Sequence, residues 1–100
     1  MESEIERKFA EYAETKGCMA YKFVSPNRVG VPDRMISCPG DLIFFIEFKS
    51  PGEPLKSWQE REITRMRKRG HSVYVCDNLF TAKKILNYEL TTRALSRNRC

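Results

Sequence analysis

Two carboxylates and one amine stand out in this sequence. Asp33 precedes a segment of alternating polarity, whereas Glu47 and Lys49 end the apolar run Leu42–Ile46 with Phe48 between them. A hydrophobic strand seldom ends in an acid and a base on either side of one aromatic residue. Two carboxylates can hold a divalent metal ion and a lysine can stabilise negative charge, so the combination suits hydrolysis of a phosphodiester.

The register of a predicted hairpin brings these side chains together. Pro39–Asp41 forms a tight turn, so that Cys38 faces Leu42 and, by the same register, Asp33 faces Glu47. Facing Cβ atoms in such a pair are ~4.5–5.5 Å apart. A slip of one residue would turn Asp33 to the opposite face, so the prediction depends on the turn.

A divalent cation would relieve the repulsion between these two carboxylates. Side chains alternate along a strand, so Lys49 shares the face of Glu47. Oxygen ligands completed by water suit Mg²⁺ or Mn²⁺, and the backbone carbonyl of Phe48 is a further candidate ligand. The alternative is a surface Asp–Lys pair beside a strand glutamate, without a metal.

Hydrophobic periodicity and turn residues predict one α/β domain with the element order α-β-β-β-α-β-α and a mixed sheet flanked by helices. Ser3 and Glu6 form a capping-box pattern at the first helix, and Gly17 ends it. The third strand is apolar on both faces, which indicates a central strand, and it opens a parallel βαβ unit. The expected strands are Met19–Val24, Arg34–Cys38, Leu42–Lys49 and Ser72–Cys76. The later helices are expected over 57–69, opened by a Ser57–Glu60 capping box, and over 80–88, with Phe80, Ile85 and Leu86 or Tyr88 inward.

Length and charge bound the function. The 100 residues allow one compact domain, residues 1–100, with a basic tail over 92–100. The formal net charge of +5 and pI of about 9.2 favour nucleic acid as the partner, and ordinary solubility charge is the alternative. No run approaches the ~20 apolar residues of a membrane span, and the N-terminus is acidic and polar, unlike a signal peptide. We expect a cytoplasmic, intracellular protein.

The cysteines do not form a metal-binding pattern. Cys18, Cys38, Cys76 and Cys100 are widely scattered, and the single histidine, His71, has no partner at ligand spacing. A zinc site is therefore not expected. In a reducing compartment, the first three are expected to be small buried hydrophobic residues, and Cys100 is expected to be exposed.

The same residues resemble the PD-(D/E)xK, or restriction-endonuclease-like, nuclease superfamily. More narrowly, the chain resembles the virus-type replication-repair nuclease domain, VRR-NUC. The matching pieces are Gly30–Asp33, Phe45–Lys49, Gln59 in the following helix and the strand segment Gly70–Val75. A bare P-D…E-x-K match is weak, but these pieces occur together in the family's order.

The resemblance implies a role for each matching residue. Asp33 and Glu47 would be metal ligands, Lys49 the catalytic lysine, and Gln59 a supporting residue from the helix start. Related nucleases also place a glutamate of the first helix at the metal, and Glu4 is the best match here, although acids near helix N-termini are favoured by the helix dipole anyway. Its competitors are Glu2, Glu6 and Glu11.

Several basic residues are candidates for contact with DNA. Lys22 and Arg28 flank the loop before Asp33, Arg34 adjoins it, and Lys56 precedes the second helix. Arg34 is a candidate either for the scissile strand or for a carboxylate partner. A run of basic residues on the second helix is a candidate phosphate-binding surface or a solvated face: Arg61, Arg65, Arg67, Lys68 and Arg69.

Two further residues have plainer interpretations. Trp58 could stack on a base, but its spacing with Ile63 and Met66 favours core packing. His71 follows the helix stop at Gly70 and is expected to be a capping or surface group rather than a general base.

Resemblance to the small stand-alone, typically viral, members implies a metal-dependent DNA endonuclease that resolves four-way Holliday junctions by paired nicks. A homodimer is expected, because a four-way junction has two-fold symmetry and two matched cuts need two sites. The exposed apolar side of the last helix is a candidate interface. The alternatives are a monomeric flap endonuclease or nickase, and a catalytically silent DNA-binding module with the same fold.

Overall fold

The computed structural model describes residues 3–97, which form a mixed four-stranded sheet with three helices. The strands lie in the order β1-β2-β3-β4, with β1, β2 and β3 antiparallel and β4 parallel to β3. This is the α/β fold with flanking helices that the sequence predicts. The elements are α1 (Glu4–Thr15), β1 (Met19–Lys22), β2 (Arg34–Cys38), β3 (Leu42–Phe48), α2 (Ser57–Lys68), β4 (Val73–Cys76) and α3 (Leu79–Arg97).

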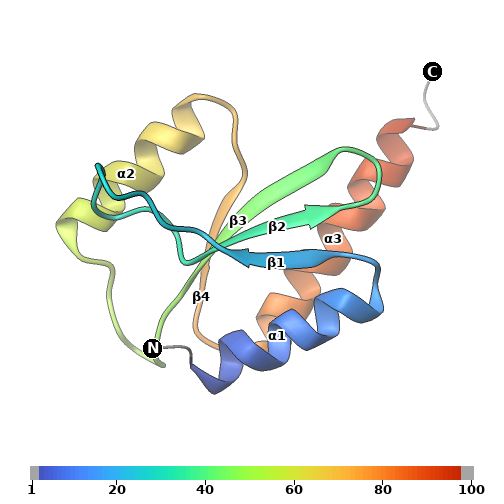
Figure 1. The fold of residues 1–100 in the computed structure, drawn as a ribbon, viewed down its shortest axis with the longest axis horizontal. Coiled ribbons are helices and arrows are strands. Elements are labelled where there is room, and N and C mark those ends of the chain that lie inside the picture. The colour runs from blue at the N-terminus through green and yellow to red at the C-terminus, as the bar shows by residue number, and fades with distance from the viewer. Residues whose placement is uncertain (1–2, 98–100) are drawn as a thin grey trace.

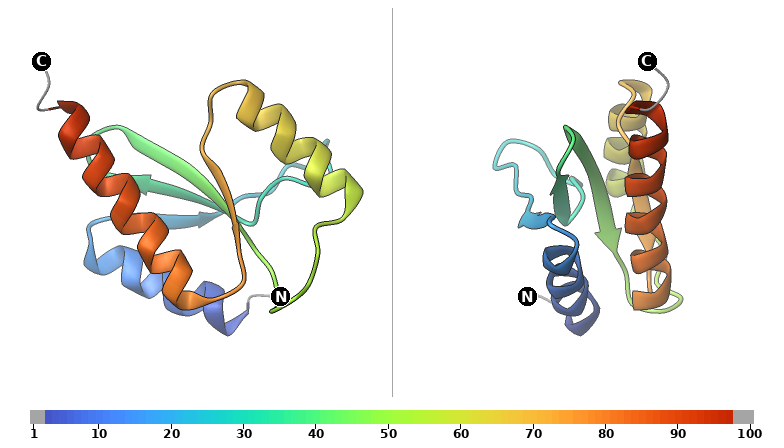
Figure 2. Two further views of the ribbon diagram at one scale, coloured as in Figure 1. Left: turned by 180° about the vertical axis from the view of Figure 1, so that it is seen from behind. Right: turned by 90° about the vertical axis from the view of Figure 1, so that its right-hand side faces the viewer.

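Alternating side chains of β3 pack into two separate hydrophobic clusters. Phe44, Ile46 and Phe48 join residues of α1 and α3 on one face of the sheet. Phe45 packs with Ile63 of α2 on the other face. Figures 1 and 2 show α1 and α3 side by side and α2 on its own across the sheet. The central position predicted for β3 is confirmed, because it pairs with a strand on each side.

The hairpin between β2 and β3 has the predicted register. Cys38 pairs with Leu42 and Arg34 with Ile46, and the turn places Asp41 at a φ of 62°. Aspartate tolerates this left-handed conformation better than most residues with a Cβ. The next opposed positions beyond Arg34 and Ile46 are Asp33 and Glu47, so the register brings the two acids to one end of the sheet.

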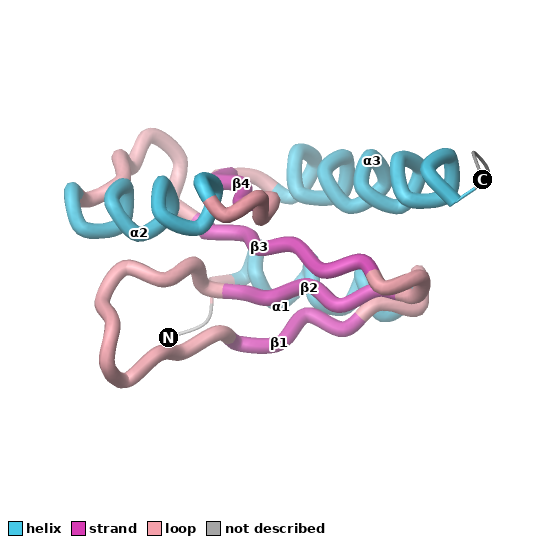
Figure 3. Tube along the Cα trace, turned by 90° about the horizontal axis from the view of Figure 1, so that it is seen from above, coloured by secondary structure: helices cyan, strands magenta, loops and turns pink. Residues whose placement is uncertain are grey.

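The long β1–β2 loop and α2 project from the same end of the sheet (Figure 3). They touch at Gly30, which has a φ of +90° and where an added Cβ would lie 2.5 Å from the carbonyl oxygen of Trp58. Only glycine suits this backbone and this approach. The contact fixes the loop that leads into Asp33 against the start of α2.

The ends of the helices differ in part from the sequence prediction. Ser3 caps α1 by accepting from the backbone N–H of Glu6 at 3.1 Å, as predicted. The predicted Ser57–Glu60 capping box is wrong, because Lys56 is the N-cap of α2 and its N–H donates to the side chain of Gln59 at 2.9 Å. The last helix is much longer than predicted and includes residues 92–97 of the basic tail.

Two aromatic residues predicted to be buried are exposed. Trp58 is 44% exposed, with the Lys56 ammonium 5.7 Å from its ring centroid, and Phe80 is 71% exposed. In α2 the buried core residue Ile63 lies more than one turn after Trp58. In α3, Leu79, Ala82 and Leu86 face the core and Phe80 does not. Helical spacing alone does not show where along a helix the contact begins.

The cysteines are buried as expected, but two of them are paired. Cys18 and Cys38 form a disulfide that joins the entry to β1 with the end of β2, and their Cα atoms are 4.3 Å apart. The expectation of separate reduced thiols is corrected for this pair. Cys76 is a buried free thiol, and Cys100 lies outside the described residues. No helix among residues 3–97 is long and apolar enough to cross a membrane.

Candidate active site

The end of the β2–β3 hairpin holds the two acids that the sequence singles out. A carboxylate oxygen of Asp33, Oδ2, accepts a hydrogen bond from the backbone N–H of Phe48 at 2.9 Å. Asp33, Glu47 and Lys49 line one cavity of about 350 Å³, together with the N-terminal turn of α1 and the segment after β3. Phe48 points into the core on the opposite face and anchors the strand between the acid and the base.

Gln59 joins the acid to the base. Lys49 Nζ lies 2.8 Å from Gln59 Oε1 and 3.4 Å from Glu47 Oε2, and Gln59 Nε2 donates to Glu47 Oε2 at 3.0 Å. Gln59 can make these contacts because it lies in the first turn of α2, close to the end of β3. The spacing of acid, base and glutamine in the sequence therefore corresponds to a contiguous hydrogen-bonded group.

Burial and mutual repulsion perturb both acids. Desolvation, with the Asp33 charge adding to it, raises the pKa of Glu47 to about 7, and the ammonium of Lys49 only partly offsets this rise. Desolvation also raises the pKa of Asp33, against the hydrogen bond from Phe48, and the charge of Glu6 adds to the rise. A carboxylate pair with these pKa values favours binding of a cation.

The donor set fits a hard divalent cation. Glu47 is 3% exposed, and its Oε1 is the buried side-chain oxygen in the described part of the chain that lacks a hydrogen-bond partner. Within residues 3–97, no three His, Cys, Asp or Glu side chains gather closely enough to enclose a metal ion. Mg²⁺ is commonly bound through one or two carboxylates, with water and substrate oxygens completing the shell. Two acids, one of them with the unpartnered oxygen Oε1 of Glu47, therefore suit Mg²⁺ better than they suit zinc, which prefers nitrogen and sulfur ligands.

The glutamates of α1 occupy different environments. Glu4 and Glu6 both line the cavity. Glu4 is exposed and pairs with Lys8 at 2.8 Å, whereas Glu6 is buried and pairs with Arg34 at 2.7 Å. Of the remaining competitors, Glu11 pairs with Arg7 on the exposed face of α1 and Glu2 lies outside the described residues.

None of the four predicted DNA contacts lines the cavity. Arg34 is buried, and its guanidinium donates to Glu6 and to the Ala20 carbonyl at 2.7 Å each, so its assignment as a DNA contact is corrected to that of a carboxylate partner. Lys22 and Lys56 are exposed. Arg28 extends from the β1–β2 loop toward Glu62 of α2.

Sequence reasoning did not identify Glu6 and Glu62 as buried carboxylates. Glu6 lies on the same helical stripe as Phe9 and Ala13 and is buried with them against the sheet. Glu62 follows Gln59 by one turn and precedes Ile63, so it too lies on the inner side of its helix. The signal in both cases was a charged residue within an apolar stripe, which is seldom buried unless it is paired.

Comparison with known proteins agrees with this arrangement. The chain matches the VRR-NUC domain family over residues 5–78, which include both strands of the hairpin and Gln59. It is 44% identical over 77 residues to a protein named "Putative nuclease p44" from Acyrthosiphon pisum secondary endosymbiont phage 1, covering 77% of this chain and 83% of that protein. A solved structure described as a VRR_NUC domain superposes with a TM-score of 0.77 at 28% identity, covering 83% of this chain and 90% of the other.

The mixed four-stranded sheet with flanking helices is that of a PD-(D/E)xK-type nuclease fold. The chain belongs to the VRR-NUC, or virus-type replication-repair nuclease, domain family. Nuclease is the class of activity that this membership supports. Domains of this type generally use divalent metal ions.

Proposed function

We propose that this protein is a Mg²⁺- or Mn²⁺-dependent endodeoxyribonuclease that resolves four-way DNA junctions by paired nicks. The observation that carries the proposal is that Asp33, Glu47 and Lys49 line one cavity, with Gln59 hydrogen-bonded to both Lys49 and Glu47. The orphaned Oε1 of Glu47 adds to it, because a buried acceptor without a donor is costly unless a cation or substrate completes it. The phage relative favours action inside an infected cell.

The side chains of this group have complementary roles in the proposed reaction. Asp33, Glu47 and the carbonyl of Phe48 would hold a divalent ion, which lowers the pKa of water and neutralises charge on the phosphate. Lys49 orients the attacking water and stabilises the negative charge that develops on the phosphate oxygens. Gln59 keeps the Lys49 ammonium directed at the cavity rather than at solvent.

Glu4 is the proposed third acid of the site, after Asp33 and Glu47. Its ion pair with Lys8 is exposed, and such pairs hold a side chain only weakly, so Glu4 can turn toward the cavity that it lines. Glu6 is less free to do so. Its pairing with the buried Arg34 would have to be broken, which is costly inside a protein.

The exposed stripe of α3 is the proposed homodimer surface. Phe80, Tyr88 and Leu95 are 71%, 61% and 60% exposed, and their spacing places them on one side of the helix. A two-fold dimer through this stripe would present two sites to the two-fold symmetry of a four-way junction. Sedimentation of wild type and a Tyr88→Ser variant tests the surface, and a wild-type monomer at micromolar concentration would remove it.

Cleavage of labelled DNA tests the activity. Wild type, Asp33→Ala, Lys49→Ala and the control Lys16→Ala are incubated with a four-way junction or a flap, with Mg²⁺, Mn²⁺ or EDTA. We expect metal-dependent symmetric nicks on the junction, a loss of at least about a hundredfold in the first two variants, and none in the control. Nicking that survives both site substitutions would overturn the proposed site. Cutting only of flaps would select the monomeric flap nuclease, and binding without cutting would select the silent DNA-binding module.

A further inference from the structure

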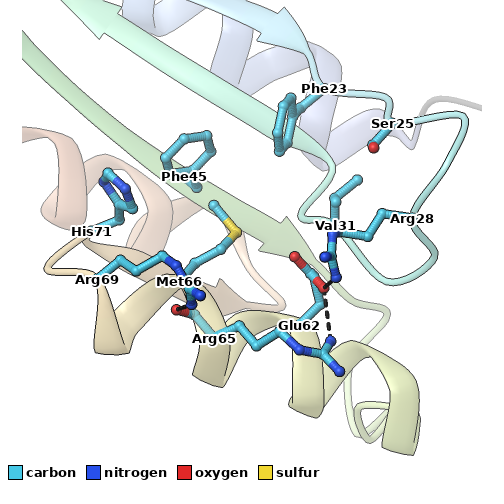
Figure 4. Close-up of a pocket in the computed structure, with 10 residues that line it drawn as sticks. All are labelled: Phe23, Ser25, Arg28, Val31, Phe45, Glu62, Arg65, Met66, Arg69 and His71. Atoms are coloured by element: carbon cyan, nitrogen blue, oxygen red, sulfur yellow. Dashed lines mark hydrogen bonds and ion pairs between the residues drawn. The ribbon is translucent and has the colours of Figure 1, made fainter.

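A second cavity lies beside the proposed active site on the same face of the sheet. It has a volume of about 410 Å³ and is formed by the β1–β2 loop, Phe45 of β3 and the later turns of α2 (Figure 4). Phe45 and Glu47 are alternate residues of one strand, so they point to the same face and are separated by about 6–7 Å along it.

Aromatic and thioether side chains form one wall of this cavity. The rings of Phe23 and Phe45 are 5.3 Å apart and tilted by 46°, and the His71 ring meets Phe45 edge-on at 6.2 Å. Met66 completes this side, as Figure 4 shows. Aromatic faces of this kind stack on nucleobases with little regard to sequence, because every base presents a π face.

Three arginines stand at the mouth of the cavity. Arg28 comes from the loop, Arg65 comes from the last turn of α2, and Arg69 is the C-cap of this helix. The side chains of Arg28 and Arg65 are 56% and 50% exposed, so part of each remains available to a ligand. Guanidinium groups pair with phosphate in a fork geometry, and three of them around an aromatic recess complement an anionic ligand with a flat ring.

A buried acid gives the cavity a directional acceptor. The side chain of Glu62 is 7% exposed, and its Oε1 takes the ion pairs with both Arg28, at 3.3 Å, and Arg65, at 3.0 Å. In Figure 4 the second carboxylate oxygen faces the space beside Met66. A carboxylate can accept from the amino group of a base, as it does with cytosine N4.

We propose that this cavity receives one unpaired nucleobase of the bound DNA, with the neighbouring phosphates on the arginines. The inference rests on the proposed function, because it assigns a subsite to the same DNA substrate. The base stacks against Phe23 and donates its amino group to Glu62. A base leaves the helical stack at least cost where pairing is already interrupted, so this subsite favours branched over continuous duplex DNA.

An abasic scan tests the subsite. Four-way junctions are prepared with one base at a time removed and every phosphate retained, and their binding is measured by fluorescence anisotropy in EDTA. For wild type, we expect one position in each half-site where loss of the base weakens binding about tenfold. With Phe23→Ala, the intact junction binds more weakly, and loss of that base has no further effect. With Glu62→Gln, the preference for an amino-bearing base over thymine at that position decreases.

Control variants separate the subsite from folding and from net charge. His71→Ala alters the aromatic wall at an exposed residue, so it replaces Phe23→Ala if that variant fails to fold by circular dichroism. Arg69→Ala weakens binding in a salt-dependent way, whereas Lys16→Ala, which removes the same charge from the end of α1, leaves the scan unchanged.

The outcomes distinguish failure of the subsite from failure of the nuclease proposal. If wild type binds and cuts junctions but loss of no single base weakens its binding, the subsite alone is overturned. An abasic effect that persists in Phe23→Ala and His71→Ala would overturn it as well. If Phe23→Ala changes the sedimentation of the protein and leaves the effect of each abasic position as in wild type, the cavity is instead a contact between copies of the chain. A wild type that neither binds nor cuts DNA would overturn both proposals.

Discussion

Gln59 accepts a hydrogen bond from Lys49 Nζ at 2.8 Å, and this contact ties the proposed catalytic lysine to the first turn of α2. The same amide donates to Glu47 and accepts from the backbone N–H of Lys56. One side chain thus contacts the lysine ammonium, donates a hydrogen bond to an acid and caps a helix. These three functions can be separated by substitution.

Gln59→Glu removes the hydrogen bond to Glu47 and keeps the two hydrogen bonds that Gln59 accepts. A glutamate can still accept from Lys49 and from the N–H of Lys56, but it cannot donate to Glu47 Oε2 and adds a third negative charge. We expect the rate of junction cleavage to fall about 10- to 100-fold with little loss of helix stability. Gln59→Ala should lower the rate and also reduce the free energy of unfolding by about 1 kcal/mol through the lost cap. Equal cleavage rates in wild type and both variants would contradict a supporting role.

The raised pKa of Glu47 should make metal-free protein less stable as pH increases. Its pKa is about 7 in the folded protein against an ordinary value of 4.5, so the folded state binds more protons between these values. Stability from this group is therefore fully present below about pH 4.5 and lost as pH rises through about 7. We expect a loss of roughly 1 to 3 kcal/mol between pH 4.5 and 8 in urea unfolding with EDTA.

Glu47→Gln is the matched control for this titration, because glutamine is neutral at every pH. The pH-dependent loss should be smaller in this variant by the same amount. Mg²⁺ should also reduce the loss in wild type, since a bound cation favours the ionised carboxylate. Superimposable pH profiles for wild type and Glu47→Gln would show that Glu47 does not titrate in this range.

Substitution of Glu4 should lower the cleavage rate, whereas substitution of Glu6 should lower the stability of the fold. Glu4→Gln removes an exposed carboxylate, so we expect junction cleavage to fall at least about tenfold with the melting temperature unchanged. Glu6→Gln removes a carboxylate from the buried Arg34, and we expect it to lower the free energy of unfolding by up to about 3 kcal/mol. Full activity of Glu4→Gln, with a stable but inactive Glu6→Gln, would transfer the proposed ligand role to Glu6.

Gly30→Ala should separate the β1–β2 loop from α2. Both Gly30 and Gly70 have a φ near +90°, but an added Cβ meets the Trp58 carbonyl at 2.5 Å in the first case and nothing within 4 Å in the second. Gly70→Ala therefore shares the backbone strain and lacks the clash. We expect Gly30→Ala to be less stable than Gly70→Ala by about 1 to 3 kcal/mol in urea unfolding and to cut DNA more slowly. Equal stability would show that the loop moves without cost.

The hairpin and its acids could be predicted because local signals agree with one another. Gly40 and Asp41 set the turn, and the alternation on either side then fixes the partner of each residue. The run of apolar residues in β3 likewise predicts burial on both faces. In these segments the identity of a few neighbouring residues determines the geometry.

Contacts between distant segments were less accessible from the sequence. The pairing of Cys18 with Cys38 depends on the β1–β2 register, in which Met19 faces Ser37 across a long loop. The pairing of Glu6 with Arg34 depends on how α1 packs on the sheet. Burial of Glu62 depends on Arg28, which lies 34 residues earlier on another loop. Such pairs show in a single sequence only as a polar residue in an apolar stripe, and the stripe does not identify the partner.

The hairpin also has a consequence for the way the protein folds. Asp33 and Glu47 lie on its two arms, and the arms are joined by a short turn. Closing a hairpin takes about 1–10 μs, whereas the parallel pairing of β3 with β4 must wait for α2 to cross between them. The two proposed ligands can therefore come together early, and the appearance of activity during refolding will be timed by the docking of α2, which carries Gln59.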